Sequence, residues 1–409
     1  TNTFNTAVGY FAGQQVTTAT FNTLVGGLSG DALTVGNKNT ALGYNTLGAD
    51  TKGDRNVAVG TDALASQNFT TSTDSYNTAV GMNAGLSVTT GVENTLIGGL
   101  AGDALTDADF NVAFGVAASV AIGNSALLRQ NFTTATDSFN VAVGHDSGSH
   151  ITTGTNNVLI GGLAGDALTD ADKNVAIGDQ ALSSDTLGSR STAVGFGALF
   201  TQNLTTATDT YNVAVGTNAG LSVTTGVGNT LLGGLAGDAL TDADFNVAIG
   251  KNALSTDTLG SFNTAVGINA LETQNFTTAT SSYNTAIGAL AGGGLTTGYY
   301  NTLVGGLAGD ALTDSDFNTA VGFNALTAET LGMYNTAIGC YSLDAQNSTT
   351  ATNSFNTAVG YYSGSGVTTG VKNTFIGANA GYATTVGGDN TSLGQEALYT
   401  NVGGAGNTA

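Results

Sequence analysis

Hydrophobic and polar positions recur along this chain as a five-residue motif, Asn-(Thr/Val)-(Ala/Leu)-(Val/Ile)-Gly, with minor variants. With the asparagine counted as position 0, position +1 is always Thr or Val, β-branched residues that favour strands. Position +3 is always large and apolar, and position +4 is Gly in all 23 complete copies. This pattern predicts a short strand followed by a sharp corner that glycine alone can form.

The motif begins 24 times, at spacings of 17, 17, 17 and then 21 residues, which defines a 72-residue module of four units. Strands this short must be stacked to bury their apolar face. The sequence therefore predicts an all-β fold, a parallel β-solenoid (β-roll or β-helix) of about 24 coils with 17 or 21 residues each, extending over roughly 110 Å. Residues 1–409 form a single repetitive domain, with modules 5–76, 77–139 (shortened at 116–118), 140–211, 212–283, 284–355 and 356–409 (truncated).

The alternation within the motif places +1 and +3 on one face and +2 on the other. We assign +1 and +3 to the interior because +3 is large and apolar. The small residues at +2 and +7 would then form an outer surface suited to self-association, as a homotrimer or as an end-to-end filament. Position 0 predicts a structural ladder of buried asparagine amides, which begins with Asn5, Asn22, Asn39, Asn56, Asn77 and Asn94.

The residue before each motif is aromatic in 13 of 24 units and Lys or Arg in five more. Stacked rings and basic stems are typical of an exposed corner. A strip that binds sugars is one interpretation of this column. The aromatic members include Phe4, Phe21, Tyr76, Phe110, Phe139 and Tyr211, and the basic members are Lys38, Arg55, Lys173, Arg190 and Lys372.

Composition narrows the classes of function. The chain has 61 Gly but no Pro, which excludes collagen, and a formal net charge of −21, which disfavours nucleic acid and anionic membranes as partners. No apolar run is long enough to span a membrane. The single cysteine, Cys340, allows neither an internal disulfide nor a cysteine metal cluster. The chain starts without Met and stops inside a repeat, so we expect a mature or truncated piece of a longer protein.

The string Asn-Thr-Ala-Val-Gly, and especially Ser119-Val120-Ala121-Ile122-Gly123, resembles the head repeats of trimeric autotransporter adhesins. The longer phrase that continues to Ala-Gly or Ala-Leu, with Thr-Thr-Gly before the next Asn, is similar to tail-fibre repeats of marine phages. This resemblance covers essentially the whole chain and implies parallel β-rolls, commonly of three chains. The sequence differs from the adhesin heads because its coils are longer and because it shows no coiled-coil stalk or anchor.

Candidate chemistry is sparse. The repeated loop Gly-Asp-Ala-Leu-Thr-Asp-Ala-Asp offers three carboxylates within seven residues, a set that could hold Ca²⁺ or could be a solvated turn. Its acids are copied from module to module, so none forms the unique pair that glycoside hydrolysis needs. His145, His150 and Cys340 match no catalytic pattern, and we expect no enzyme activity and no cofactor other than Ca²⁺. The candidate Ca²⁺ ligands are Asp103, Asp107, Asp109, Asp166, Asp170, Asp172, Asp238, Asp242, Asp244, Asp310, Asp314 and Asp316.

The 21-residue coils carry their four extra residues in a Thr-rich segment, which predicts a loop on one edge of the solenoid. Each such loop contains an Asn-x-Thr sequon, a candidate for glycosylation and otherwise for receptor contact. A sixth sequon, at Asn390, lies outside the series. The five loop sequons begin at Asn68, Asn131, Asn203, Asn275 and Asn347.

Together these features predict an extracellular structural or adhesive fibre, as in a phage tail fibre or a microbial surface filament. Its partners would be further copies of itself, cell-surface glycans or a covalently attached glycan. A carbohydrate-degrading tailspike is the alternative from the enzyme class. An ice-binding solenoid is a third reading, disfavoured because the Thr-Thr pairs, such as Thr89-Thr90 and Thr224-Thr225, occur in only some coils.

Overall fold

A computed structural model describes residues 3–107, 109, 112–115, 120–123, 125–131 and 138–409. It confirms the predicted fold class: the described part of the chain is all-β, a parallel β-solenoid of about 22 turns with about 17 residues per turn. The chain divides into two compact units. The first comprises Thr1–Ser191 and Asn203–Asp209, and the second Thr192–Gln202 and Thr210–Ala409. The motif starts at Asn111 and Ser119 and the junction at 116–118 lie outside the described residues.

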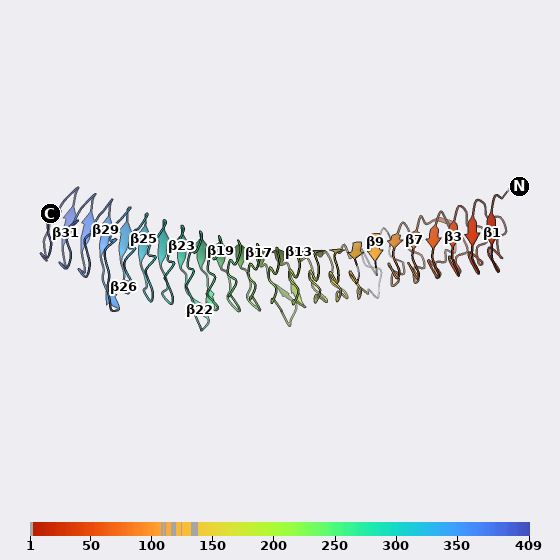
Figure 1. Cartoon of the computed structure of the whole chain (residues 1–409), viewed down its shortest axis with the longest axis horizontal. Helices are drawn as coiled ribbons and strands as arrows, with labels where there is room; N and C mark the ends of the chain where they lie inside the picture. The colour runs from red at the N-terminus through yellow and green to blue at the C-terminus, as the bar shows by residue number, and fades with distance from the viewer. Residues whose placement is uncertain (1–2, 108, 110–111, 116–119, 124, 132–137) are drawn as a thin grey trace. The chain divides into compact units, whose positions relative to one another are not determined.

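In the first unit, the pentapeptide strands stack in parallel, each paired with the next one along the chain, as in Thr6↔Thr23 and Thr23↔Thr40. Figure 1 shows these strands as successive rungs, one for each coil. They are β1 (Thr6–Val8), β2 (Thr23–Val25), β3 (Thr40–Leu42), β5 (Val57–Val59), β7 (Thr78–Val80), β8 (Thr95–Ile97), β9 (Val112–Gly115), β10 (Val120–Gly123), β11 (Val141–Val143), β12 (Val158–Ile160) and β13 (Val175–Ile177).

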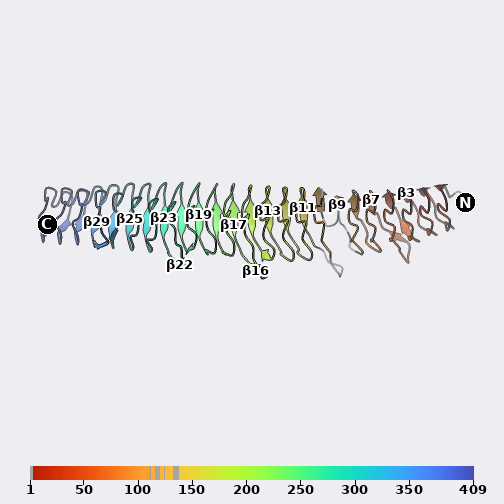
Figure 2. The same ribbon diagram turned by 60° about the horizontal axis from the view of Figure 1, so that its bottom comes forward.

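The second unit repeats this arrangement, with the same residue positions in register, as in Thr264↔Thr285 and Thr285↔Thr302. Its strands follow one another in the same order in both views (Figures 1 and 2). They are β15 (Thr192–Val194), β17 (Val213–Val215), β18 (Thr230–Leu232), β19 (Val247–Ile249), β21 (Thr264–Val266), β23 (Thr285–Ile287), β24 (Thr302–Val304), β25 (Thr319–Val321), β27 (Thr336–Ile338), β29 (Thr357–Val359), β30 (Thr374–Ile376) and β31 (Thr391–Leu393).

The 21-residue coils add short parallel pairs beside the main ladder. In the second unit, β22 belongs to a 21-residue coil, and β26 pairs with β28 of the next 21-residue coil. The segments labelled β22 and β26 lie on the same side of the solenoid (Figure 1), as the prediction of loops on one edge requires. The short strands are β4 (Gly53–Asp54) with β6 (Thr73–Asp74), β14 (Gly188–Ser189) with β16 (Thr208–Asp209), β20 (Gly260–Ser261) with β22 (Thr280–Ser281), and β26 (Gly332–Met333) with β28 (Thr352–Asn353).

The faces of the main strands are the reverse of our assignment. Position +2 is the buried one, as at Leu231 and Ala248, which are both 0% exposed, whereas the side chains at +1 and +3 point outward. Position +7 is also interior, as at Ala236, so the surface of small residues proposed for self-association does not exist. The interior is narrow, and each strand contributes one inward side chain to it. We call the outward side, made of positions +1 and +3, the strand face.

Residues at +2 and +8 fill this narrow interior by compensating each other in size. Leu231 at +2 lies against Gly220 and Gly237, the +8 residues of its own and the preceding coil. A Cβ on either glycine would come within 2.7 Å of a Leu231 methyl carbon. Position +8 is a buried leucine, as at Leu254, only where +2 is Ala both in its own coil (Ala248) and in the following coil (Ala265). Where +2 of the following coil is Leu, as for Ala214 before Leu231, position +8 is Gly even beside an Ala. Close packing therefore decides where glycine and leucine alternate at +8.

The position-0 asparagines form a buried ladder. The backbone N–H of Asn39 donates to Oδ1 of Asn22 (2.9 Å), and Nδ2 of Asn22 donates to the carbonyl of Gly36 (2.9 Å). The same pair of contacts recurs from coil to coil, at Asn56 on Asn39 for instance (2.9 Å). Each amide thus satisfies backbone groups that the narrow interior shields from water.

Candidate functional surfaces

The residue before each position-0 asparagine lies at an exposed corner, and we call this series the corner column. In the second unit its rings form a ladder in which consecutive rings stack with centroids 5.0 to 5.6 Å apart. The rings belong to Phe245, Phe262, Tyr283, Tyr300, Phe317, Tyr334 and Phe355. Their backbones adopt the left-handed conformation, with φ of 50–63°.

This stacking determines which surfaces of the rings a ligand can contact. A sugar that packs on an aromatic side chain needs an open ring face, but the inner rings cover each other's faces. Tyr299 also packs edge-on against Tyr300 and Phe317. The surface that remains is a row of ring edges, so the inner rings do not offer the stacking sites that the sugar-strip interpretation requires.

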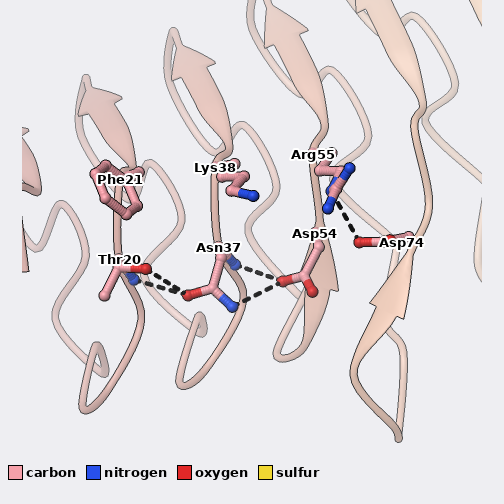
Figure 3. Close-up of a pocket in the computed structure, with 7 residues that line it drawn as sticks. All are labelled: Thr20, Phe21, Asn37, Lys38, Asp54, Arg55 and Asp74. Atoms are coloured by element: carbon pink, nitrogen blue, oxygen red, sulfur yellow. Dashed lines mark hydrogen bonds and ion pairs between the residues drawn. The ribbon is translucent and has the colours of Figure 1, made fainter.

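In the first unit the corner column becomes basic and borders a shallow pocket of about 360 Å³. Figure 3 shows Lys38 between the ring of Phe21 and the guanidinium of Arg55, on three consecutive coils. Arg55 Nε lies 2.9 Å from Asp74 Oδ1. Its Nη1 donates to the Tyr76 hydroxyl (2.6 Å), and its Cζ lies 5.2 Å from the centre of that ring.

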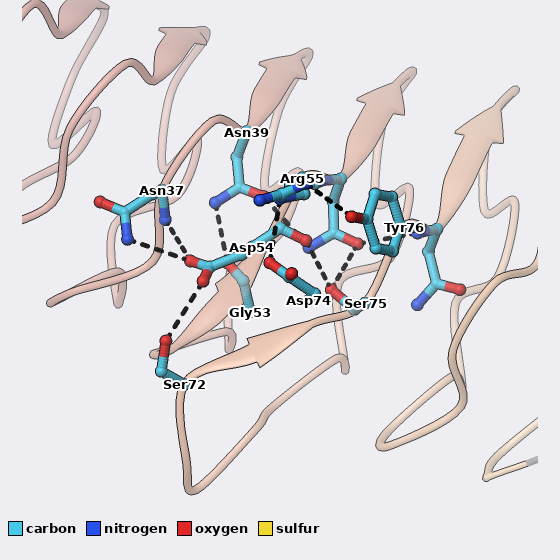
Figure 4. A network of polar contacts seen from close by, with 11 residues as sticks. Asn37, Asn39, Gly53, Asp54, Arg55, Ser72, Asp74, Ser75 and Tyr76 are labelled. Atoms are coloured by element: carbon cyan, nitrogen blue, oxygen red, sulfur yellow. Dashed lines mark hydrogen bonds and ion pairs between the residues drawn. The ribbon is translucent and has the colours of Figure 1, made fainter.

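The acidic side of this pocket is occupied by coil-to-coil hydrogen bonds (Figure 4). Asp54 Oδ1 accepts from the backbone N–H of Asn37 (2.5 Å), and Asp54 Oδ2 accepts from Ser72 Oγ (3.2 Å). The two acids and two bases of the lining balance in charge. Exposed pairs of this kind contribute about 0–1 kcal/mol, so the arrangement fixes neighbouring coils more than it creates a charged binding site.

The same constellation recurs later in the first unit. Lys173 and Arg190 again occupy successive corners, and Arg190 Nε lies 2.9 Å from Asp209 Oδ1. A basic pair followed by tyrosine therefore marks modules one and three, whereas aromatic rings occupy the same corners in modules four and five.

The acidic triplets are not gathered into one cluster. They fall at positions +9, +13 and +15, and most contact the preceding or following coil. Asp242 Oδ1 accepts from Thr225 Oγ1 (2.5 Å), and Asp244 Oδ1 accepts from the backbone N–H of Val227 (2.8 Å). Equivalent bonds join Asp109 to Val92, Asp170 to Thr153, Asp172 to Thr155, Asp314 to Thr297 and Asp316 to Tyr299.

The other triplet members differ among themselves. Asp166 accepts from Ser183 Oγ (2.6 Å) and Asp310 accepts from Thr327 Oγ1, both in the following coil, whereas Asp107 accepts from the adjacent Thr106 (3.1 Å). Asp103 is half-buried, and the buried Oδ1 of Asp238 has no hydrogen-bond partner among the residues that the structure describes. Across the described residues, no three Asp, Glu, His or Cys side chains come together as a metal site. Ca²⁺ binding stays a prediction, and these contacts give most of the carboxylates a structural use without it.

A buried acid in the coil that precedes a 21-residue coil was missed by the sequence analysis. Asp257 is 0% exposed and accepts from the backbone N–H groups of Gly260 (3.0 Å) and Phe276 (3.0 Å) and from Gln274 Nε2 (2.6 Å). Gln274 in turn accepts from Asn284 of the ladder (2.9 Å). Equivalent acids stand at Asp50, Asp185 and Glu329. The signal in the sequence is an acid three residues before Gly, followed 17 residues later by Gln.

Burial raises the pKa of several carboxyls above the ordinary value of 3.8. At Asp50, desolvation outweighs the hydrogen bonds from Gln67 and Gly53 that favour the charged form. Desolvation likewise raises the pKa of the +9 carboxyls of Asp103, Asp166, Asp238 and Asp344. Each of these groups therefore binds its proton more tightly in the folded chain than in the unfolded chain.

We expect mild acidification from neutral pH to increase stability. Between pH 3.8 and the raised pKa values, the folded chain binds more protons than the unfolded chain. The free energy of unfolding therefore increases as the pH falls through this window and decreases again as the pH rises. Thermal unfolding followed by circular dichroism from pH 7 to pH 4 should show a rising midpoint. Repeating the series in about 1 M salt screens the repulsion from the −21 net charge. A midpoint that falls on acidification in both salts would contradict the expectation.

The sequons lie where the loops leave the coils. Asn68, Asn131, Asn203 and Asn347 are exposed and Asn275 is half-buried. Thr residues of the preceding coil donate to the Oδ1 atoms of Asn68, Asn203, Asn275 and Asn347 at 3.1–3.2 Å. Residues 132–137, which complete the sequon of Asn131, lie outside the described residues. Asn390 is 0% exposed in the ladder, so its amide is closed to modification. Glycosylation of the five loop sequons stays a prediction.

The remaining candidates take part in local contacts. His145 is exposed at a turn beside Asp146 (3.3 Å), and Nδ1 of His150 lies 2.8 Å from the carbonyl oxygen of Asp166. Cys340 is a half-buried free thiol. None of the described residues belongs to a helix that is long and apolar enough to cross a bilayer. Neither a scan against protein-family models nor a search of curated proteins finds a match for this chain.

Proposed function

We propose that this chain is a structural and adhesive segment of an extracellular fibre, of the kind found in phage tails or microbial surface filaments. One observation carries the proposal: the side chains form columns that contact their counterparts in the next coil. The asparagine ladder, the aromatic ladder and the acid-to-backbone bonds all repeat in this way. Such a surface suits a fibre protein whose length is determined by the number of repeated coils.

Self-association is part of this proposal, as a homotrimer or as an end-to-end filament. The support for it comes from the strand face of β10–β13, where Val occupies +1 and Val or Ile occupies +3. Ile122, Ile160 and Ile177 are 36–43% exposed there. A face without charges lets copies with a net charge of −21 approach each other.

Placing lysine at two of these positions, Val158→Lys with Val175→Lys, is expected to lower the mass measured by light scattering at micromolar concentration. Two charges would have to be desolvated in the apolar contact. The matched control places lysine at two exposed loop threonines outside the sequons, Thr206 and Thr278, and should keep the wild-type mass. A wild-type chain that is strictly monomeric, without end-to-end growth, would count against self-association.

A carbohydrate-degrading tailspike is the competing function. Incubation of the wild-type chain with capsular and host polysaccharides, followed by a reducing-end assay, separates the two. The fibre proposal expects no increase in reducing ends over the buffer control. Robust cleavage would overturn it and would place the function among the glycan-degrading enzymes.

A further inference from the structure

Going beyond the fibre proposal, we infer that the strand face of the second unit, from β21 to β31, binds the ordered water of an ice surface. This face carries the threonines at position +1, which point outward. They are distinct from the Thr-Thr pairs, which occur in only some coils.

A single outward column of threonine runs through eight consecutive main strands. Each threonine pairs in register with the next, so the hydroxyl groups recur at the strand spacing of about 4.8 Å over roughly 34 Å. The column consists of Thr264, Thr285, Thr302, Thr319, Thr336, Thr357, Thr374 and Thr391.

The hydroxyls of this column are not committed to the protein. None of the eight donates or accepts a side-chain hydrogen bond within the part of the chain that the structure describes. A second threonine column, at position +12, behaves differently. Thr313 Oγ1 donates to the carbonyl of Thr330 (3.0 Å), and Thr241 Oγ1 donates to that of Thr258 (3.0 Å). The +12 threonines connect coils, whereas the +1 threonines make no side-chain hydrogen bond to any described residue and are exposed at Thr302 and Thr391 and half-buried at the other six positions.

The neighbouring +3 column completes the surface with aliphatic side chains. It holds Val or Ile on seven of these strands and Leu393 on the last, about 6.7 Å from the threonine column. Ile287, Ile338 and Ile376 are 38–41% exposed. Neither column contains a charged residue, in a chain with a net charge of −21. The strand face therefore presents a column of hydroxyl groups beside a column of aliphatic groups. It lacks the charged side chains that would bind water in a less ordered arrangement.

This chemistry favours a repeating solid over a soluble ligand. Each threonine hydroxyl can both donate a hydrogen bond to water and accept one from it. Water molecules that the rigid threonine column already holds in an array lose little further entropy when they become part of the ice lattice. Individually weak contacts act together because the coils fix their relative positions. A second copy of the chain would have to bury the open hydroxyls, which costs free energy unless each finds a partner. The valine stretch of β10–β13 in the first unit lacks these hydroxyls, so it is the better contact for a copy.

The test measures partition of the full chain into slowly growing ice. The wild-type chain should be enriched in the ice fraction over a globular control protein of similar size. The double variant Thr302→Lys, Thr319→Lys interrupts the middle of the column and should reduce the ratio of protein in ice to protein in liquid by about tenfold or more. The matched control, Thr278→Lys with Thr350→Lys, alters two exposed loop threonines of the same unit outside the sequons and should keep the wild-type ratio.

Circular dichroism and thermal unfolding of both double variants establish that each still folds. A milder variant, Thr302→Val with Thr319→Val, keeps the shape and removes only the hydroxyls, and it should give a ratio between those of the wild type and the lysine variant. A wild-type chain excluded from ice as fully as the globular control would overturn the inference. So would a lysine variant that keeps its ice ratio, or one whose only change is a smaller oligomer by light scattering. The last result would identify this face as an interface between copies. None of these results bears on the polysaccharide test of the fibre proposal.

Discussion

Replacing Gly305 by alanine is expected to open the solenoid around β24. Gly305 has φ +135°, a conformation that side-chain-bearing residues rarely adopt, and a Cβ placed there would lie 2.5 Å from the carbonyl oxygen of Gly322 in the next coil. The opposing atom is backbone within the ladder, where the N–H of Gly322 donates to the carbonyl of Val304 (2.8 Å). Relief therefore requires separating two coils, and we expect a loss of more than about 4 kcal/mol in the free energy of unfolding.

The neighbouring glycine supplies the control. A Cβ on Gly306 would meet Phe323 at 3.5 Å, an ordinary contact, so Gly306→Ala should change stability little. Because each coil contacts only its neighbours, the damage in Gly305→Ala should be local. Hydrogen exchange should accelerate most at the amides of the coils next to β24. Equal stability of the two variants would show that the corner tolerates a side chain.

Replacing Asn318 by alanine is expected to be the second most damaging change. Its Oδ1 accepts from the backbone N–H of Asn335 (3.0 Å), and its Nδ2 donates to the carbonyl of Gly332 (3.0 Å). Oδ1 of Asn318 also accepts from Nδ2 of Asn335 (3.2 Å), and Asn335 is buried. The truncation therefore leaves two buried donors of Asn335 without their acceptor, at about 1–3 kcal/mol each, whereas the Gly332 carbonyl keeps its hydrogen bond from Ser315 Oγ. Chemical denaturation should show a loss of about 2–6 kcal/mol.

A graded series tests the cause. Asn318→Ser should lose less than Asn318→Ala, because the chain itself carries a buried serine at this position of another coil, Ser191, whose N–H still donates to Asn174 Oδ1 (2.8 Å). Asn347→Ala, in an exposed loop, should cost little. If Asn318→Ala were as stable as Asn347→Ala, the ladder would not be a source of stability.

The strands and their stacking were predictable because the same residue types recur at the same positions of the repeat with little variation. A β-branched residue at +1 and an invariant Gly at +4 specify a short strand and a corner, and the fixed spacing specifies that equal positions align. The described strands pair in that register, as Thr264↔Thr285 does. The role of position 0 also followed, since an amide repeated in every coil needs partners, and its neighbours supply them.

The direction of the strand faces did not follow from the pattern. Alternation defines two faces but does not say which is interior, and the larger side chains at +3 favoured the wrong choice. The informative signal was the exchange between +2 and +8: Leu231 stands with Gly220 and Gly237, whereas Ala248 stands with Leu254. Two positions at which a large residue at one is matched by a small residue at the other occupy the same confined space.

The sequence by itself determined the period, the strands, the glycine corners and the asparagine ladder, because each depends on a residue type that one local conformation requires. Only the tertiary structure decided which side chains are enclosed, because a coil of about 17 residues leaves room for one inward side chain per strand. It also decided that Asp257 is buried against Gln274 and that the +1 threonines are free while the +12 threonines are bonded. Those outcomes depend on distances between coils, which no local pattern specifies.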